Sequence, residues 1–369
     1  MNYCRVLFLT LLLTSVFVFS QVRETDIDEV QIIASKKLKK KDNPAYAILQ
    51  EVWKRKKSNG LSQFQDYQYE EYEKIELDLA NLDSTFTQKK IFNKVGFIFK
   101  YADTLDQPNQ LSLPVYFNET LYKNFGKNRP SKKEKREILA NKSSGLTSSD
   151  AMANTAKNLY KEIDIYDNVL NFFNIGFTSP IATDGFSAYD YQLLADETIN
   201  GNECYRIKYV PKRKDVLSIY GVLYISKENY AVVRATLKST KSINVNFVNG
   251  FYYDLEFDNP SDSIFLPKKN YQEIQMSVFG KKEKSKSIVA KKTVSFSDYL
   301  FDQNLSDAFF ETKEKYLSDS EFLKDEAYWQ ENRKEELSKS EANVYTMMEE
   351  LADVPQFKKA VKVYEVVSS

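Results

Sequence analysis

Apolar and polar residues alternate with a period of two through much of this chain. From residue 67 onward, apolar side chains share one parity, and acids and lysines mostly occupy the other. The apolar positions are Tyr67, Tyr69, Ile75, Leu77 and Leu79. Such alternation predicts a long β-strand with one buried face. Tyr72 breaks the parity, which predicts a bulge there.

The same alternation recurs between residues 188 and 302, where short turns separate successive apolar segments. Asn200-Gly201 joins two of these segments, and this dipeptide is a strong signal for a tight hairpin turn. Strands are expected at 97–101, 113–117, 189–198, 203–210, 220–226, 231–239, 243–248, 251–257, 266–279 and 285–296. Their number and spacing predict an antiparallel meander.

Helical periodicity appears at both ends of this series. Asn43-Pro44 supplies a capping side chain and a proline at the first helical position, and Asn59-Gly60 supplies a stop. The apolar stripe between them is Ile48, Leu49, Val52 and Trp53. Further helices are expected over 150–161, 318–332 and 338–351. Ser338 and Glu341 form a capping box at the start of the last one.

The first twenty residues have the three-part pattern of a secretory signal. Arg5 precedes the uncharged run 6–19, and Gln21 follows the expected cleavage point. A transmembrane anchor is the alternative, but the run is shorter than the roughly 20 apolar residues that span a bilayer. Cys4 lies before the run, so we expect no lipid anchor. The sequence therefore predicts export.

Charge and composition exclude several classes of function. Basic and acidic residues balance at 52 each, which gives no overall field for binding nucleic acid. The chain contains no histidine, which excludes serine–histidine and cysteine–histidine catalysis and ordinary zinc sites. Cys204 is the only cysteine after the expected cleavage point, and we expect it to be buried and inert. No cofactor or metal is expected.

Carboxylate pairs are the remaining catalytic candidates. Glu70, Glu71 and Glu73 follow one another along the strand that begins near residue 67. Strict alternation places Glu71 and Glu73 on the apolar face, where bare carboxylates are costly to bury. We therefore expect an irregular strand that turns them to water. A carboxylate-based hydrolase is accordingly the least favoured hypothesis, and the protein is predicted not to be an enzyme.

Several longer segments resemble one family. They are IYDNVLNFF, FTSPIATDGFSAYDYQLL, CYRIKYVPKRKD with the following YGVLYIS, INVNFVNGFYYD, and YWQENRKEELSKSEANVYTMMEEL. Together they resemble an uncharacterised family of the Gram-negative cell envelope. Its members often carry an N-terminal carboxypeptidase-regulatory-like domain and a C-terminal outer-membrane β-barrel region. The strand series also resembles the curved sheet of periplasmic lipoprotein carriers.

The resemblance completes the expected architecture. The fold class is mainly β (α+β), a curved antiparallel sheet or half-barrel with packing helices and a helical C-terminal segment. The expected divisions are a signal peptide at 1–20, an extended segment and basic tether at 21–41, a β-rich domain at 42–302 and a helical segment at 303–369. The chain ends where the family's barrel region would begin, which implies either a piece of a barrel protein or a soluble short form.

Two groups of side chains are candidates for binding. Aromatic and aliphatic residues of the curved sheet would shelter an acyl chain or peptide, although core packing is an alternative role for each. These are Tyr67, Tyr69, Ile75, Tyr189, Tyr191, Tyr205, Tyr220, Tyr224 and Phe247. Basic residues near turns would contact anionic lipid, although solubility is an alternative. These are Lys132, Lys133, Arg136, Lys212, Arg213 and Lys214.

Two functional hypotheses remain ahead of the hydrolase. In the first, a non-enzymatic domain of the periplasm or outer membrane shelters a lipid or a partner peptide next to an outer-membrane barrel. In the second, the protein is a free-standing periplasmic lipid or lipoprotein carrier. The expected partners are outer-membrane lipid or an envelope protein, with no nucleic acid.

Overall fold

The computed structural model describes residues 40–104, 111–145, 162–213, 216–240, 248–260, 264–277, 287–312 and 323–355. Contacts divide the chain into two units, 1–42 and 43–369, and the elements below belong to the second unless stated. The expected signal sequence, the helix at 150–161, Phe247 and Lys214 lie outside the described residues.

Strands make up about half of the described structure. They are β1 (Asp66–Leu82), β2 (Asp103–Thr104), β3 (Leu111–Lys127), β4 (Lys133–Gly145), β5 (Val169–Phe172), β6 (Ile175–Thr178), β7 (Tyr189–Leu193), β8 (Glu197–Ile199), β9 (Asn202–Pro211), β10 (Ile219–Ser226), β11 (Val232–Ser239), β12 (Val248–Asp258), β13 (Leu266–Ser277) and β14 (Ser287–Phe301). This mainly β architecture confirms the fold class predicted from the sequence.

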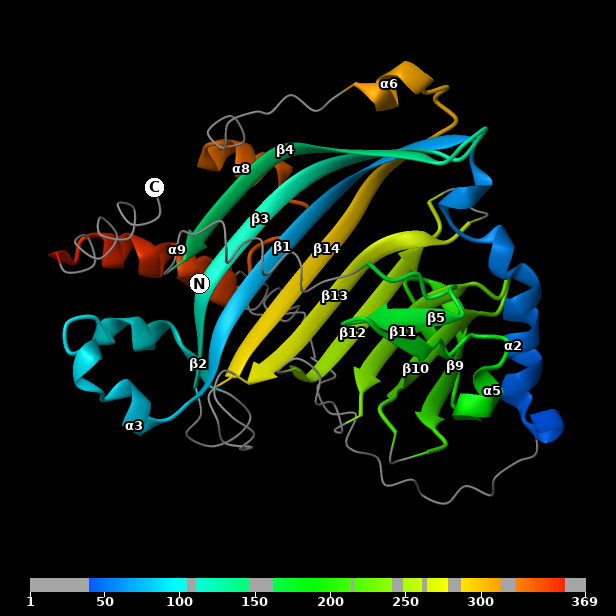
Figure 1. Ribbon diagram of the computed structural model, residues 1–369, viewed down its shortest axis with the longest axis horizontal. Helices are drawn as coiled ribbons and strands as arrows, with labels where there is room; N and C mark the ends of the chain where they lie inside the picture. Colours follow the sequence, from blue (N-terminus) through cyan, green and yellow to red (C-terminus); the bar gives the residue numbers. More distant parts are fainter. Residues whose placement is uncertain are drawn as a thin grey trace, which may run out of the picture. The chain divides into compact units, whose positions relative to one another are not determined.

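Twelve of the described strands form one curved, open, antiparallel sheet (Figure 1). The main path runs β2-β3-β1-β14-β13-β12-β11-β10-β9-β7, with β4 paired to β3 and β8 paired to β9. The long strands β1, β3 and β14 lie side by side, and β1 therefore has β3 on one side and β14 on the other. β5 and β6 form a separate hairpin.

Helices are shorter and lie before, between or after the strands. The α-helices are α2 (Pro44–Arg55), α3 (Ser84–Thr87), α5 (Gly185–Ala188), α6 (Asp307–Glu311), α8 (Glu326–Asn332) and α9 (Lys339–Ala352). The 3₁₀ helices are η1 (Lys40–Asp42, in the first unit), η2 (Lys56–Ser58), η3 (Leu61–Gln63), η4 (Lys90–Phe92) and η5 (Gly96–Tyr101). Among the described residues, no helix is long and apolar enough to cross a membrane.

Local sequence signals set several of these boundaries as predicted. The Asn43 side chain accepts a hydrogen bond from the Ala45 amide at the start of α2. Ser338 and Glu341 form both hydrogen bonds of the capping box at the start of α9. Asn200 and Gly201 both have positive φ angles, 48° and 82°, between β8 and β9. These conformations are what a tight hairpin between twisted strands requires.

Two local predictions were wrong. Residues 97–101 belong to η5 rather than to a strand, and Ile98 and Tyr101, three positions apart, share its buried side. The bulge expected at Tyr72 is also absent, since the register of β1 against β14 shifts between Gln68 and Glu70 instead. Tyr72 departs from the apolar parity because it is buried on the opposite face of the sheet, in a cluster with Trp329.

The register defines two faces of the sheet. Directly opposed residues of neighbouring antiparallel strands point to the same side. One such row runs across the sheet as Glu73, Val294, Asn270, Leu255, Ala235 and Leu223. We call this side the hairpin face, because Phe172 of the β5–β6 hairpin stacks on Phe251 of the same side. We call the other side the α9 face.

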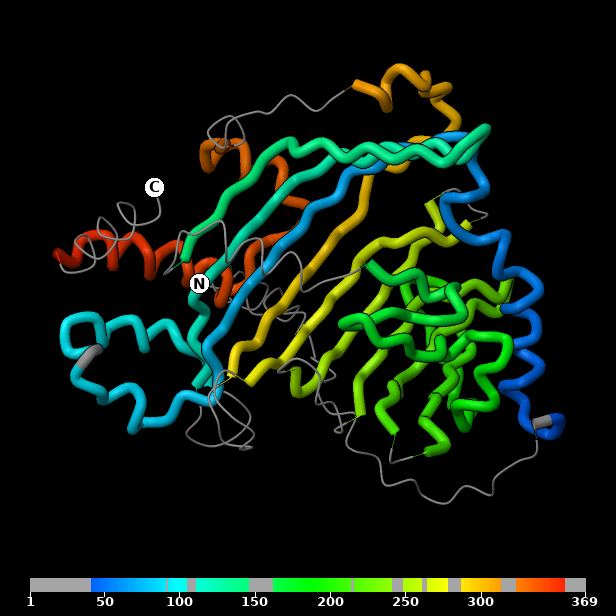
Figure 2. The backbone as a smooth tube through the Cα atoms, viewed as in Figure 1, coloured from blue at the N-terminus to red at the C-terminus, as the bar shows by residue number. Residues whose placement is uncertain are grey.

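Aromatic side chains of the hairpin face are buried where β5 and β6 pack on β12. Figure 2 shows the course of the backbone in this region. Phe172 lies 4.5 Å from Phe251 and 4.9 Å from Tyr253, measured between ring centres. Both sheet residues are almost completely buried. Burial of aromatic rings is worth several kcal/mol in such clusters, and it fixes the hairpin against the sheet.

The α9 face is covered over β1 and β3 by α8 and α9. Trp329 of α8 is buried against Tyr72, Leu121 and Ala140. Tyr345 of α9 packs edge-on against Phe117, with ring centres 5.5 Å apart. α8 and α9 thus lie on the sheet. α9 matches the range predicted from its apolar stripe, whereas the described part of the helix expected over 318–332 is helical only from Glu326.

Candidate functional site

A pocket of about 310 Å³ opens on the hairpin face, at the end of the sheet formed by β1, β3 and β4. Its volume is at the lower end of the range for small-molecule sites. Strands contribute most of the wall, and the segment before β5 contributes Glu162. The lining residues are Tyr67, Tyr69, Asn124, Phe125, Glu134, Lys135, Arg136 and Glu162.

An aromatic row extends one wall of this pocket. Tyr67 and Tyr69 of β1 stack with ring centres 6.2 Å apart, and Tyr69 contacts Tyr299 of β14 at 5.3 Å. Tyr299 stacks in turn on Phe301, which stacks on Phe64 at 3.7 Å. All of these rings except Tyr67 are half-buried and keep part of their surface exposed. The row offers a continuous apolar surface beside the pocket.

Tyr67 owes its position to Gly126 on the neighbouring strand β3. The two residues are directly opposed in the register, and the tyrosine ring lies across the glycine. A Cβ atom at Gly126 would stand 2.0 Å from Cζ of Tyr67, far inside contact distance. The glycine therefore permits a close approach that any side chain would prevent.

Charged side chains lie directly behind the pocket wall. Arg136 of β4 pairs with Glu71 of β1, at 2.6 Å between Nη2 and Oε1. Lys292 of β14 pairs with Glu73 of β1 at 2.8 Å, and Arg136 lies 3.9 Å from Glu73. We call these four residues the pocket-face cluster. Two carboxylates and two cations give it a formal charge of zero.

Polar neighbours from β3 complete this cluster. The Asn124 amide donates to Oε2 of Glu71 at 3.0 Å, and the Tyr122 hydroxyl lies 3.4 Å from Oε1 of Glu73. The Arg136 guanidinium stacks 3.5 Å above the centre of the Tyr122 ring. Side chains from three other strands, β3, β4 and β14, therefore hold the two carboxylates.

Burial changes the titration of the cluster. It raises the pKa of Glu71 to about 7, against the lowering effect of Arg136, while Glu162 and Glu73 raise it further. Burial opposes the charge on Arg136, yet Glu71, Tyr122 and Glu73 raise the pKa of that side chain overall. Burial also raises the pKa of Tyr69 well above its usual range. Glu71 is thus able to exchange a proton near neutral pH.

The expected solvation of Glu71 and Glu73 was wrong. Both lie on the apolar face that strict alternation indicates, and they are 1% and 2% exposed. Their burial is tolerable because cations and donors from other strands pair with them, which removes most of the cost of an isolated charge. Nothing local in the sequence identifies these partners, since Arg136 is 65 residues from Glu71.

The pocket unites three residues that the sequence singled out. Tyr67 and Tyr69 from the aromatic candidates and Arg136 from the basic candidates all line it. Ile75 is on the same strand and face, buried further along β1. Glu71, Glu73, Lys292 and Tyr299 were not among the binding candidates. Only the parity of β1 indicated that the two glutamates belong to the apolar face.

The remaining aromatic candidates lie elsewhere. Tyr189 and Tyr191 are buried, and their hydroxyls donate to the backbone carbonyls of Thr178 and Pro180. Tyr205 stacks on Tyr230 near the start of β9. The register places the other two, Tyr220 and Tyr224 of β10, on the α9 face rather than the hairpin face. The structure does not bring these residues to the pocket.

The basic candidates do not form one surface. Lys132 pairs with Glu134 and Lys133 with Asp307 and Glu311, all near the β3–β4 turn. Lys212 and Arg213 follow β9, near the opposite edge of the sheet. Lys212 donates to the carbonyl of Phe186. Acidic partners neutralise most of the charge at the β3–β4 turn, which argues against a strong anionic-surface patch there.

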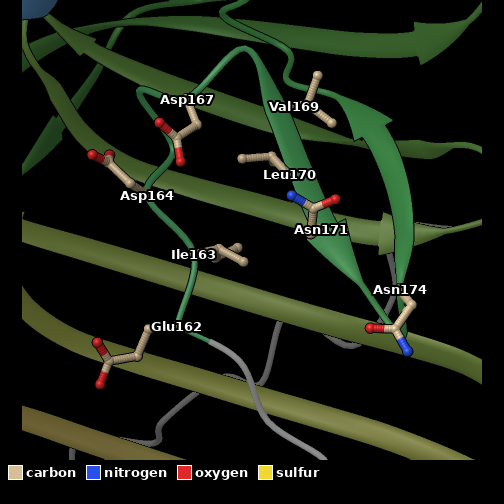
Figure 3. A pocket seen from close by; sticks show the side chains of 8 residues that line it. All are labelled: Glu162, Ile163, Asp164, Asp167, Val169, Leu170, Asn171 and Asn174. Carbon is tan, nitrogen blue, oxygen red and sulfur yellow. The ribbon is translucent and has the colours of Figure 1, made fainter.

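A second hollow, of about 490 Å³, lies between the segment 162–167 and the β5–β6 hairpin (Figure 3). Asp164 and Asp167 lie along that segment, and Asn174 sits at the hairpin turn. The Asp164 carboxylate accepts from the Tyr166 amide at 2.9 Å, so it shapes a turn. Within the described part of the chain, no group of three or more acids, histidines or cysteines is placed to hold a metal ion.

Cys204 behaves as expected from its place in a strand. It is a free, fully buried thiol in β9, and burial raises its pKa to about 11. A thiol with a raised pKa is a poor nucleophile. The residue therefore packs the sheet and offers no reactive group.

A family model matches residues 48–293, which include the pocket and most of the sheet. The chain belongs to the Family of unknown function (DUF5686). The domain of unknown function expected from the sequence is thereby confirmed, whereas the regulatory-like domain and barrel region of the resemblance remain predictions. The search of curated proteins found no match to this chain.

Three solved structures match this chain at low sequence identity. A DUF1329 family protein from Desulfovibrio piger is 15% identical, with 73% of this chain and 97% of that chain covered and a TM-score of 0.28. A putative outer membrane lipoprotein-sorting protein domain from Vibrio parahaemolyticus is 9% identical, with 71% and 95% covered and a TM-score of 0.27. A LolA superfamily protein from Nitrosomonas europaea is 14% identical, with 73% and 97% covered and a TM-score of 0.22.

Proposed function

We propose that this protein is a non-enzymatic binding domain of the cell envelope, which shelters the apolar part of a lipid or partner peptide in the β1–β3–β4 pocket. The main support for the proposal is that Tyr67, Tyr69 and Arg136 line the same pocket. A row of half-buried aromatic rings continues beside it. The lining combines three aromatic rings with five polar or charged side chains, and the aromatic row continues from it. Such a mixed lining suits the junction between the polar and the apolar part of an amphiphilic ligand.

The aromatic row supports the apolar half of this proposal. Tyr69, Tyr299 and Phe301 are neither fully buried nor scattered, and they stack into one surface. Contiguous exposed apolar surface on a folded domain is characteristic of binding sites. The phenylalanine-rich buried core near β12 is different, because the β5–β6 hairpin already covers it.

The absence of histidine supports a role without catalysis. Acid–base work by two carboxyls needs one protonated and one ionised group facing a substrate. In the pocket-face cluster, both carboxyl groups are almost completely buried behind the wall and each faces a cation, so neither faces a substrate. Placement of the domain in the periplasm or at the outer membrane is supported by the signal-like pattern of the first twenty residues.

The test is native mass spectrometry of the protein purified from the envelope fraction of its own cells. We expect a bound lipid or peptide in the wild type. Tyr69→Ala should reduce its occupancy several-fold, because the ring lines the pocket and joins the aromatic row. Gly126→Ala should act in the same direction by displacing the Tyr67 ring.

Tyr220→Ala is the matched control. Tyr220 is a half-buried tyrosine on a strand of the same sheet, but it points to the α9 face. Its loss should leave the occupancy unchanged. Wild-type protein recovered without any ligand, or equal losses in Tyr69→Ala and Tyr220→Ala, would count against the proposed function.

A further inference from the structure

The Arg136 side chain is the polar group best placed to meet a ligand in the pocket. It lines the opening, and 39% of its side-chain surface is exposed. One of its nitrogens pairs with Glu71, whereas its buried Nε has no hydrogen-bond partner. A guanidinium offers five donor hydrogens and no acceptor. A ligand group that forms a hydrogen bond with the exposed part of this guanidinium must therefore be an acceptor.

The Glu71 carboxylate occupies the position that an anionic ligand would take on Arg136. The carboxylate is 1% exposed and lies directly behind the pocket wall. It is held by Arg136 from β4 and Asn124 from β3. An acid group that enters from the pocket must compete with this internal partner for the same guanidinium.

The cost of a buried net charge determines whether an anion can replace Glu71 on Arg136. The pocket-face cluster has no net charge when both glutamates are ionised. An added anion would leave it with a charge of −1 in a desolvated place, which is unfavourable. A proton on Glu71 compensates for this charge, and the proton comes from solvent. No other atom is transferred.

We propose that the ligand's polar end is a singly charged acid group that binds Arg136 in exchange for Glu71, with uptake of one proton by Glu71. This inference rests on the proposed function and specifies the chemistry of its ligand. Burial of Glu71 against Glu73 and Glu162, which raises the pKa of Glu71 to about 7, places the exchange in the physiological range.

The charged and titratable groups around Glu71 come from every neighbouring element. Glu73 lies on the same strand, Tyr122 on β3, Arg136 on β4, Lys292 on β14 and Glu162 before β5. The remaining nearby groups are Tyr69 and Tyr299, whose own pKa values burial raises, and Glu134 and Lys135, which pair with Lys132 and Glu137. Glu162 faces the pocket with a negative charge, so Glu162→Gln should strengthen anion binding.

The experiment is isothermal titration calorimetry of the full chain with octanesulfonate, whose charge does not titrate near neutral pH. We expect binding about tenfold tighter at pH 6 than at pH 8, because the competent protonated fraction falls by that factor around a pKa of about 7. Titrations in buffers of different ionisation enthalpy should show uptake approaching one proton per ligand at pH 8.

Glu71→Gln mimics the protonated state and is the decisive variant. It should bind octanesulfonate equally at both pH values, as tightly as the wild type does at pH 6, and without proton uptake. Wild-type affinities within twofold of each other at pH 6 and pH 8 would overturn the proposal. A tenfold pH effect that persists in Glu71→Gln would overturn it equally.

Two further probes separate this inference from the proposed function. If octyl glucoside binds as tightly as octanesulfonate and Tyr69→Ala weakens both, the acid group is wrong but the apolar pocket stands. If methanesulfonate binds as tightly as octanesulfonate, the site takes a free anion and the sheltering of an apolar chain fails. If Tyr69→Ala weakens the binding of none of these probes, both proposals fail.

Discussion

Strands β1 and β3 carry buried carboxylates on opposite faces of the sheet, and the two faces stabilise them differently. On the hairpin face, Glu71 pairs with Arg136, a side chain that also lines a pocket. On the α9 face, the Arg333 guanidinium donates two hydrogen bonds, of 2.9 and 2.8 Å, to the carboxylate of Glu119 on β3. Helices cover the second network, whereas the first reaches the pocket through the partly exposed Arg136 side chain.

The network around Glu119 is saturated. The hydroxyls of Tyr72 and Tyr345 also donate to its carboxylate, each at 2.8 Å, and the residue is completely buried. Nearby, Lys74 of β1 pairs with Glu341, which also caps α9. Polar groups that are all satisfied hold one geometry. This network therefore fastens α8 and α9 to the sheet, whereas the buried Nε of Arg136 in the pocket-face cluster has no hydrogen-bond partner.

The largest effect should follow from breaking the saturated network. Glu119→Ala leaves Arg333 and two tyrosine hydroxyls without their acceptor, and removal of one partner of a buried pair costs about 3–5 kcal/mol. Urea denaturation should show this loss of unfolding free energy. Hydrogen exchange should show α8 and α9 released first.

Glu137→Ala is the control for this variant, because Glu137 pairs with Lys135 at an exposed position on β4. It should change the unfolding free energy by less than about 0.5 kcal/mol. A loss below about 1 kcal/mol in Glu119→Ala would mean that the helices are held by apolar packing alone, and the contrast between the two faces would disappear.

An intermediate effect should appear as pH dependence on the hairpin face. The folded-state pKa of Glu71, about 7, lies above the value of 4.5 for an exposed glutamate, so the native state holds its proton more tightly. Stability from this group is present at low pH and is lost as the pH rises from about 4.5 to 7. The loss is about 1–3 kcal/mol.

Glu71→Gln removes this titration. Between pH 5 and pH 8, the wild type should therefore lose about 1–3 kcal/mol of unfolding free energy relative to the variant. Urea denaturation at both pH values measures it. Burial also raises the pKa of Glu76 to about 7, but that residue is present in both proteins and cancels. A pH-independent difference would show that Glu71 is ionised throughout.

The smallest effect should come from the rim of the α9 face. Lys142 of β4 pairs with the half-exposed Glu326 and lies 4.2 Å above the centre of the Tyr345 ring. Exposed pairs of this kind contribute about 1 kcal/mol or less. Lys142→Ala should therefore lower the unfolding free energy by no more than that, as read from urea denaturation. A loss above about 2 kcal/mol would show that Lys142 belongs to the saturated network around Glu119.

Local sequence determined the elements that depend on neighbouring residues. The period of two predicted β1, the Asn43-Pro44 cap began α2, and the Ser338–Glu341 box began α9. The Asn200-Gly201 turn is equally local, because both residues adopt positive φ. The missing histidines restrict the chemistry of the chain whatever its fold. The caps, the turn and the alternation are set by contacts within a few positions along the chain.

Only the tertiary structure decided what the buried charges do. Parity places Glu71 on the apolar face, but the register of β4 and β3 brings Arg136 and Asn124 to it and so permits its burial. The same register sends Tyr220 and Tyr224 to the opposite face from Tyr69. A strand's alternation encodes which residues share a side, whereas the partners across the sheet depend on pairing between distant segments. The pocket is a product of that pairing.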